Sequence, residues 1–532
     1  MKAFDTAVRQ TCARRLLPVG IALASAAAGL LVLSMALHPA ARLDARELGT
    51  GPRMAFQRAA THAAGLDYPN CRFGVGGSIE SYPVTELNIG WHMDWSAQPT
   101  PTLTNGAEYV QVVRLAPDVS SGYRFTPATD TLHLIIDQNP GAIWLVGNEP
   151  DSPWQDNLVP EDYARAYHHV YTLIKQRDPS ARLGAGSIVQ PTPLRFQYLD
   201  RVLNSYRQLY GEAMPADLWN VHTYILREID ASDPEAQPNG PYEVWGAFIP
   251  PGLTATRGVL YEKSQMFSLD IFWQRLNDFR TWMRDNSYRD VPLYITELGE
   301  LFPYPPDTPG GAFYYDEFGV PITEERVATF MTSTFDILLN LLDPEIGYPV
   351  DGNRLVQRWL WYSVSGTNLG GALYDPVTRQ RRLLGDVFSS YTHAISPGVD
   401  LLAVRVVAEP AVIRYAGQPE TTTLKATISN IGNIAMTAPM TVAFYAGTPP
   451  AGTPIGLPRL ITSVLEGCAG TAEVSTTWSN LGAGAHPIYI EVAPGAGVIE
   501  VRDDNNVAAG FALVATEHVY LPAMTKAHPD EP

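Results

Sequence analysis

Short runs rich in apolar and β-branched residues alternate with amphipathic helical patterns between about residues 70 and 395. Eight of these runs are predicted to be strands: Arg72–Gly76, Asn88–Trp95, Tyr109–Leu115, Ala142–Asn148, Arg182–Val189, Leu218–Tyr224, Pro292–Glu297 and Gln357–Val364. Strand–helix alternation repeated about eight times predicts a parallel (β/α)8 TIM barrel over residues 68–396. An open doubly wound sheet is the alternative, but Gly74-Val75-Gly76-Gly77 does not complete the glycine-rich phosphate loop that such a sheet normally carries.

From about residue 400 the helical patterns stop and short strands recur between turn residues. Seven strands are predicted: Leu401–Val407, Thr422–Ser429, Met440–Tyr445, Leu460–Leu465, Ala472–Trp478, Pro487–Val492 and Asn506–Val514. Seven strands within about 115 residues predict an all-β, immunoglobulin-like sandwich over residues 400–515. We therefore expect a multidomain chain, with a polar linker (42–67) before the barrel and a polar tail (516–532) after the sandwich.

The amino end carries 22 residues without a charge, Leu16–Leu37, directly after Arg14 and Arg15. Positive residues before an apolar stretch keep the amino end in the cytoplasm and direct the rest outward. Residues 1–41 are thus predicted to be an export helix, either a signal peptide or a membrane anchor. The length suits an anchor, whereas the small residues around Ala40 suit a cleavage site. Both alternatives place the body of the protein outside the cell or on its surface.

Charge and cysteine content exclude several classes of function. The formal net charge of −18 argues against nucleic acid as a partner, because phosphate binding needs clustered Lys and Arg. The chain has three cysteines, too few for a disulfide framework, so Cys71 and Cys468 are expected to be unpaired. Neither a Gly-x-Ser-x-Gly elbow nor a His-Glu-x-x-His zinc motif occurs. We therefore expect no cofactor and no metal ion.

Two apolar strands run straight into a glutamate. The segment 142–147 leads into Asn148-Glu149-Pro150, and 293–296 leads into Glu297-Leu298-Gly299. A barrel carries its functional groups at the carboxyl ends of its strands. Two carboxylates there are the minimum for glycosidic cleavage, because one protonates the leaving oxygen while the other attacks or activates water. One such glutamate alone would be a solvated strand-end charge, but two at the fourth and seventh predicted strands indicate catalysis.

These two motifs resemble the clan A retaining glycoside hydrolases, which are built on a (β/α)8 barrel. Three segments are similar to the Asl1-like catalytic domain of that clan: Gly90-Trp91-His92-Met93-Asp94-Trp95-Ser96, Asn148-Glu149-Pro150-Asp151 and His222-Thr223-Tyr224. This chain departs from the pattern at Asp94, where Asn is usual, and at 111–115, which replaces a Pro-Met-Leu-Trp run. The resemblance implies that Glu149 is the acid/base, that Glu297 is the nucleophile and that Asn148 holds the sugar 2-hydroxyl.

Seven further residues are predicted to contact the substrate: His222, Tyr224, Trp361, Trp91, Asp94, Trp95 and Arg114. His222 and Tyr224 alternate along the sixth strand and so point the same way, and Tyr224 is expected to keep Glu297 ionised. Trp361 is expected to stack on a sugar ring. Packing or hydrogen bonding within the core is the alternative for each of them.

The implied activity is that of an exported glycoside hydrolase acting on a β-linked polysaccharide or oligosaccharide. Glu297 attacks the anomeric carbon, while Glu149, its pKa raised by the neighbouring negative charge, protonates the leaving oxygen. The sandwich resembles the CARDB module of bacterial surface proteins in 429–433, 442–447 and 503–506, and this resemblance implies attachment to a cell surface or cell wall. A cell-surface protein that binds glycan without cleaving it is the alternative.

Overall fold

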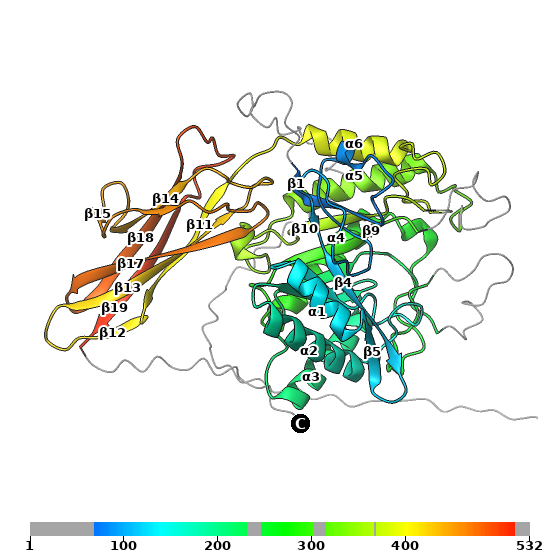
Figure 1. The fold of residues 1–532 in the computed structure, drawn as a ribbon, viewed down its shortest axis with the longest axis horizontal. Coiled ribbons are helices and arrows are strands. Elements are labelled where there is room, and N and C mark those ends of the chain that lie inside the picture. Colours follow the sequence, from blue (N-terminus) through cyan, green and yellow to red (C-terminus); the bar gives the residue numbers. More distant parts are fainter. Residues whose placement is uncertain (1–68, 231–245, 302–314, 367–368, 517–532) are drawn as a thin grey trace, which may run out of the picture. The chain divides into compact units, whose positions relative to one another are not determined.

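The computed structural model describes residues 69–230, 246–301, 315–366 and 369–516 (Figure 1). The predicted export helix, the linker and all but the first residue of the tail lie outside these ranges. Within them, no helix combines the length and apolarity needed to cross a membrane.

The (β/α)8 TIM barrel predicted for residues 68–396 is wrong. The region instead forms a curled, mixed sheet of ten strands, in the order β3-β2-β1-β10-β9-β8-β7-β6-β4-β5. The sheet is mixed because β5 runs antiparallel to β4, whereas the other paired strands are parallel. Its strands are β1 (Asn70–Gly76), β2 (Ile89–Met93), β3 (Glu108–Tyr109), β4 (Gln111–Asp118), β5 (Gly122–Thr126), β6 (Ile143–Val146), β7 (Arg182–Ile188), β8 (Leu218–His222), β9 (Leu293–Gly299) and β10 (Arg358–Tyr362).

The strand–helix repeat fails in the first third of this region. Between β1 and β2 there is only a short 3-10 turn, Val84–Leu87, and 94–107 between β2 and β3 contain no helix. Pro99 and Pro101 lie in the second of these segments, and proline removes a backbone donor that a helix needs. The described residues accordingly hold six α-helices: α1 (Thr129–Gln138), α2 (Pro160–Arg177), α3 (Pro193–Tyr210), α4 (Leu269–Asp285), α5 (Glu324–Asn340) and α6 (Leu383–Ala394).

Local sequence signals account for three of the helix ends. The Ser268 hydroxyl caps α4 by accepting the backbone N–H of Ile271, and Thr323 caps α5 through the N–H of Arg326. The α2 helix ends at Arg177, before Pro179. Each helix buries one apolar face against the sheet.

Six strands of the curled sheet, β2, β4, β6, β8, β9 and β10, contribute to two separate apolar layers. Phe73, Trp359 and Trp361 pack in the larger core between the sheet and the helices. Trp91 and Leu360 belong to a second cluster with residues of β6, β8 and β9. Because successive residues of a strand point to opposite faces, Trp359 and Trp361 lie on the helix side of β10, and Leu360 lies on the other.

Residues 401–515 form a second, all-β region with nine strands in two sheets. They are β11 (Leu401–Glu409), β12 (Val412–Arg414), β13 (Glu420–Asn430), β14 (Met440–Ala446), β15 (Thr453–Pro454), β16 (Arg459–Ile461), β17 (Gly470–Leu481), β18 (Gly484–Pro494) and β19 (Val507–Ala515). The smaller sheet is β11-β13-β17; the larger is β12-β19-β18-β14-β15, with β16 on β14. The two sheets lie against each other (Figure 1), and buried side chains of both sheets form one core.

This arrangement departs from the predicted immunoglobulin-like sandwich. There are nine strands instead of seven, and β12 runs parallel to β19, which makes the larger sheet mixed. The two additional pairing strands, β12 and β15, have three and two residues. Strands this short give almost no alternation in the sequence, so the sequence does not predict them.

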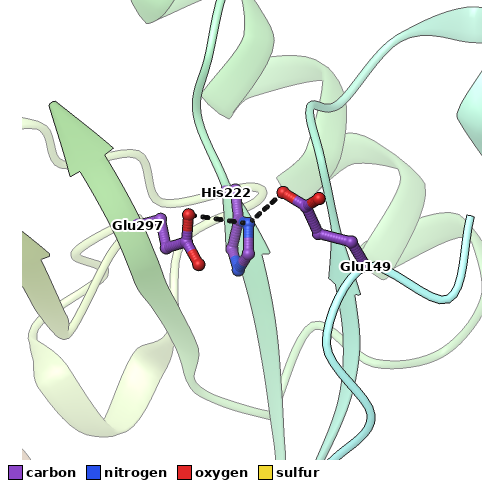
Figure 2. A group of neighbouring side chains, drawn as sticks. All are labelled: Glu149, His222 and Glu297. Carbon is purple, nitrogen blue, oxygen red and sulfur yellow. Dashed lines mark hydrogen bonds and ion pairs between the residues drawn. The ribbon is translucent and has the colours of Figure 1, made fainter. Parts of the chain in front are cut away.

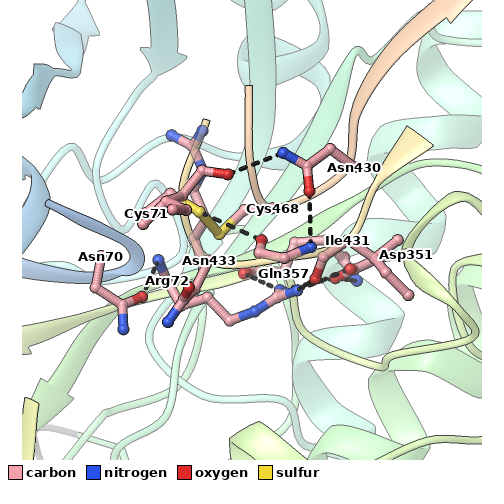
Figure 3. Close-up of a disulfide and its surroundings, with 12 residues drawn as sticks. Asn70, Cys71, Arg72, Asp351, Gln357, Asn430, Ile431, Asn433 and Cys468 are labelled. Atoms are coloured by element: carbon pink, nitrogen blue, oxygen red, sulfur yellow. Dashed lines mark hydrogen bonds and ion pairs between the residues drawn. A yellow bond between two sulfur atoms is a disulfide. The ribbon is translucent and has the colours of Figure 1, made fainter. Parts of the chain in front are cut away.

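Cys71 and Cys468 form a disulfide, which corrects the expectation that both are unpaired (Figure 3). Cys71 lies in β1 of the curled sheet, and Cys468 precedes β17 of the all-β region. The backbone N–H of Cys71 also donates to the carbonyl of Asn433 at 3.1 Å, and Arg72 Nη2 donates to the carbonyl of Ile431 at 2.8 Å. The two cysteines are 397 residues apart in the sequence, so only the fold could show the pairing.

Replacing Cys71 and Cys468 together by Ser is expected to lower the free energy of unfolding by about 2–5 kcal/mol, because the crosslink restricts the unfolded chain. Thermal unfolding without reductant, followed by circular dichroism, measures the effect. Cys12→Ser is the matched control, since Cys12 takes no part in this disulfide, and it should leave the midpoint unchanged. Equal midpoints for the double variant and the wild type would contradict the prediction.

Candidate active site

Two glutamates face each other at one edge of the curled sheet. Glu149 lies three residues after the end of β6, and Glu297 is the fifth residue of β9. Their residues are 8% and 7% exposed, so both are largely removed from water but remain reachable. Figure 2 shows the two carboxylates on either side of the His222 ring. The strand-end pattern in the sequence thus identified two side chains that the fold brings together.

The chain turns sharply between β6 and Glu149. Gly147 and Glu149 both have left-handed backbone conformations, with φ of 88° and 46°. Such a conformation suits glycine but is uncommon for a glutamate, so the surroundings must hold it in place. The backbone N–H of Glu149 donates to the carbonyl of Ser187 at 3.0 Å, and its carbonyl accepts from Ser152 at 3.0 Å. These contacts fix the direction of the Glu149 side chain.

Arg114 acts on this turn through a buried carboxylate. Its Nε donates to Asp156 Oδ1 at 2.7 Å. The other oxygen of Asp156 accepts from the backbone N–H groups of Leu115 and Asn148, each at 2.8 Å. Asp156 therefore connects the middle of β4 to the residue before Glu149. The structure places Arg114, which was predicted to contact substrate, in an ion pair that supports the turn.

His222 connects the two carboxylates. It is the last residue of β8 and is fully buried. Its Nδ1 donates to Glu149 Oε1 at 2.8 Å and lies 3.5 Å from Glu297 Oε2. Burial disfavours a charge on the ring, but the negative charge of Glu297 and the hydrogen bond to Glu149 outweigh it and raise the pKa of His222.

Tyr224 is bonded to the second carboxylate. Its hydroxyl donates to Glu297 Oε2 at 2.7 Å. Burial raises the pKa of Glu297 to about 7; the charge of His222 lowers it, the charge of Glu149 raises it, and the Tyr224 hydroxyl lowers it again. The raised pKa of Glu297 was not predicted from the sequence. Because the three groups interact strongly, the protons belong to the group as a whole.

Trp95 and Tyr362 lie beside the carboxylates. Their ring centroids are 5.2 Å apart in an edge-to-face arrangement. Burial raises the pKa of Tyr362 to about 12, and the charges of Glu297 and Glu149 add to the effect. The Trp95 side chain, in contrast, lowers the pKa of Glu297. Trp95 was among the predicted site residues, but Tyr362 was not. Tyr362 follows Trp361 on the same strand, so the two side chains point to opposite faces, and this alternation could have indicated Tyr362.

Two predicted tryptophans lie away from the carboxylates. Trp361 packs in the helix-side core against Phe335, with ring centroids 6.1 Å apart, and its indole donates to the carbonyl of Gly371 at 2.8 Å. Trp91 is fully buried in the inner cluster of the sheet. A Cβ on Gly74 would lie 2.5 Å from the Trp91 indole, so this packing requires a glycine. Both tryptophans therefore lie in core environments, which was the alternative to substrate contact.

Asn148 and Asp94 differ in whether their side chains already have hydrogen-bond partners. Among the described residues, the Asn148 amide has no hydrogen-bond partner, although the residue is only 5% exposed next to Glu149. Asp94 already accepts from Ser96 Oγ at 2.7 Å and from the hydroxyl of Tyr109. The free amide of Asn148 is available to a bound hydroxyl, whereas Asp94 is held within its own loop.

Within the described part of the chain, Glu149, His222 and Glu297 are the one group of three ligand-type side chains close enough to hold a metal ion. One oxygen of each glutamate and one ring nitrogen all lie within 4.8 Å of one another. His222 Nδ1 already bonds to Glu149 in this arrangement. The same geometry is suited to moving a proton between two carboxylates.

Comparison with known proteins gives one match to a family. Residues 76–234 match the family model described as a glycosyl hydrolase catalytic core. The matched range includes Glu149, His222 and Tyr224 and ends before Glu297. This match supports a glycoside hydrolase domain in the first described region. The comparison with curated proteins found no match.

Three solved structures show a weak likeness. A GH128 (subgroup II) endo-β-1,3-glucanase from Sorangium cellulosum is 17% identical, with 60% of this chain and 98% of that chain covered and a TM-score of 0.36. A mutant subgroup I enzyme from Amycolatopsis mediterranei, in complex with laminarihexaose, is 16% identical over 60% and 98%, with a TM-score of 0.37. A subgroup III curdlan-specific exo-β-1,3-glucanase from Blastomyces gilchristii is 15% identical over 60% and 99%, with a TM-score of 0.35. Likenesses at these TM-scores carry no argument about the substrate of this chain.

Glu297→Gln is expected to stabilise the protein more at pH 8 than at pH 5. The pKa of Glu297 is about 7 in the folded state and about 4.3 in an unfolded chain. Stability from this group is complete below the unfolded pKa and is lost as pH rises through about 7. Gln cannot ionise, so the variant should gain about 1–3 kcal/mol at pH 8, with His222 offsetting part of the effect.

Thermal midpoints at the two pH values test this expectation. Glu473→Gln is the matched control, because Glu473 is exposed on β17 and its replacement should shift the midpoint equally at both pH values. A midpoint difference between Glu297→Gln and wild type that does not grow with pH would show that burial of Glu297 carries no ionisation cost.

Proposed function

We propose that this protein is a glycoside hydrolase that cleaves a β-linked polysaccharide with retention of anomeric configuration. The observation that carries the proposal is the pair of glutamates, which face each other with one carboxylate oxygen of each within 4.8 Å. Retaining enzymes place their two carboxyl groups about 5–5.5 Å apart, whereas inverting enzymes need about 6.5–9.5 Å for a water molecule. The close pair supports direct attack by one carboxylate.

The hydrogen bonds support different roles for the two glutamates. Glu297 accepts from the Tyr224 hydroxyl, a contact that stabilises the ionised carboxylate a nucleophile needs. Glu149 accepts from His222 Nδ1 and follows Asn148, whose amide is available to a sugar hydroxyl. We assign Glu297 as the nucleophile and Glu149 as the acid/base.

The reaction then proceeds in two steps. A carboxylate oxygen of Glu297 forms a bond to the anomeric carbon as the glycosidic C–O bond breaks, and Glu149 gives its proton to the leaving oxygen. Glu149 then takes a proton from water, whose oxygen attacks the same carbon and releases Glu297 as a carboxylate. The pair needs one proton at the start, and the raised pKa values of Glu297 and His222 favour keeping that proton within the site at neutral pH.

Export is the second part of the proposal. Disulfides persist in oxidising environments outside the cytoplasm, and the Cys71–Cys468 bond supports such a location. It agrees with the export segment predicted from 1–41. We further propose that residues 68–396 catalyse and that 400–515 attach the protein to a surface.

The wild-type protein is expected to release reducing sugar from at least one polymer in a panel of laminarin, curdlan, galactan, xylan and mannan. Glu149→Gln and Glu297→Gln should each lower kcat/KM about 10³-fold, because each removes a group that the chemical step requires. Glu212→Gln, an exposed glutamate after α3, is the matched control and should retain full activity. Proton NMR of the first product should show the β-anomer.

Two outcomes would contradict the proposal. Equal background release by wild type and both variants on every polymer would favour glycan binding without cleavage. A first product with the α-anomer would favour inversion. An aryl glycoside with an activated leaving group separates the roles: Glu149→Gln should still give a burst of phenol, and Glu297→Gln should not.

Tyr224→Phe is expected to lower kcat/KM about 10- to 100-fold, because a hydrogen bond to a charged group contributes about 1.5–3 kcal/mol. The pKa of Glu297 should also rise further. Tyr288→Phe is the matched control, since its buried hydroxyl donates to the Met214 carbonyl at 2.7 Å, away from the glutamates. Unchanged kinetics for Tyr224→Phe would remove Tyr224 from the site.

A further inference from the structure

The outer face of the larger sheet in the all-β region carries aromatic side chains on three neighbouring strands. Tyr445 lies on β14, Tyr489 on β18 and Phe511 on β19. Phe511 is 64% exposed, and the two tyrosines are half-buried. We call these three residues the aromatic face. Large apolar side chains grouped on a solvent-facing sheet surface indicate a binding site for a partner.

The strand register places the aromatic face in one row. Tyr445 is directly opposite Tyr489 across the β14–β18 pair, and Tyr489 is directly opposite Ala509 across the β18–β19 pair. Phe511 is two residues from Ala509 and therefore points the same way. The Cβ atoms of directly opposed residues lie about 5 Å apart, and those of diagonal neighbours lie about 7–8 Å apart. The three aromatic side chains thus lie in a row across the strands.

The outer face of the smaller sheet has the composition expected of a surface in contact with water. Lys425 pairs with Glu409 at 2.6 Å. Arg405 Nε donates to the hydroxyl of Thr427, which in turn bonds to Glu473, each at 3.3 Å. The contrast shows that the aromatic face is a property of the larger sheet and not of the whole region.

We propose that the aromatic face binds a neutral polysaccharide by stacking pyranose rings on Tyr445, Tyr489 and Phe511. The apolar faces of sugar rings pack against flat aromatic surfaces. Glu491 is the one charged residue among the outward positions of β14, β18 and β19, and it accepts from the Tyr445 hydroxyl at 3.2 Å. A strip with hydroxyl and carboxylate groups at one end and no cation suits an uncharged ligand rich in hydroxyl groups.

The choice of a glycan as occupant rests on the proposed hydrolase function. The Cys71–Cys468 bond joins the strand β1 to the region that carries the aromatic face. Binding of a polymer at the aromatic face would therefore raise its concentration at the glutamate pair in the same molecule. A second copy of the chain is the competing occupant, and the test separates the two.

Binding is measured with the full chain carrying Glu297→Gln, so that the polymer is not consumed. The probes are insoluble particles of curdlan, cellulose, xylan, mannan and chitin, and depletion from solution gives Kd. On any particle that the parent binds, Phe511→Ala and Tyr489→Ala should each raise Kd about tenfold, as expected for the loss of one aromatic contact. Tyr489→Phe, which keeps the ring, and Val407→Ala, an exposed apolar residue on β11, should leave Kd unchanged.

Unchanged Kd for both alanine variants, or no binding of the parent to any particle, would overturn the proposal. A dimer seen in sedimentation velocity that Phe511→Ala dissociates, with Kd unaffected, would assign the face to a second copy instead. Hydrolysis of soluble oligosaccharides should be equal in wild type and Phe511→Ala. If wild type hydrolyses nothing while the alanine variants still lose particle binding, the hydrolase proposal fails and the binding face stands.

Discussion

The burial of three interacting ionisable groups governs the structure of the candidate site. Glu149 and Glu297 carry like charges close together in a place with little water, an arrangement that disfavours ionisation of both. His222 reduces the conflict because Nδ1 donates to one carboxylate and lies near the other. Tyr224 adds a donor to the same oxygen of Glu297, Oε2, that lies near His222. The site can therefore hold a proton near neutral pH and still present an ionised carboxylate.

Strand register decides which side chains can take part. β8 and β9 pair so that His222 lies opposite Glu297 after a local irregularity in the register. In β10, Leu360 belongs to the inner cluster and Trp361 to the helix-side core. The next residue, Tyr362, has its pKa raised by burial and by the charges of both glutamates. Because side chains alternate with a period of two, one residue separates a packing role from a place beside the carboxylates.

The sequence predicted those parts of the site that depend on local pattern. A glutamate after an apolar run is visible in the chain itself, and so is the alternation of His222 and Tyr224. Features that depend on pairing over long distances were missed. One is the disulfide, which joins Cys71 to Cys468. Another is the choice of which β10 side chains enter the inner cluster, because it depends on how the sheet curls. The barrel prediction counted eight strands where the sheet has ten, and it assumed an α-helix after each one, which the segments after β1 and β2 do not contain.

A buried ion network beneath the Glu149 turn shows how strongly its position is maintained. Arg195 of α3 is fully buried and pairs with Asp151, two residues after Glu149, and with Glu228 at 3.0 Å. Its guanidinium also donates to the carbonyl of Phe248 at 2.9 Å. A buried ion pair seldom stabilises a protein more than apolar residues of similar volume would. The network is therefore better explained by the directional bonds it provides, which tie the segment after Glu149 to two other loops. A glutamate with a left-handed backbone needs such support, because without it the backbone would relax and the side chain would turn away from His222.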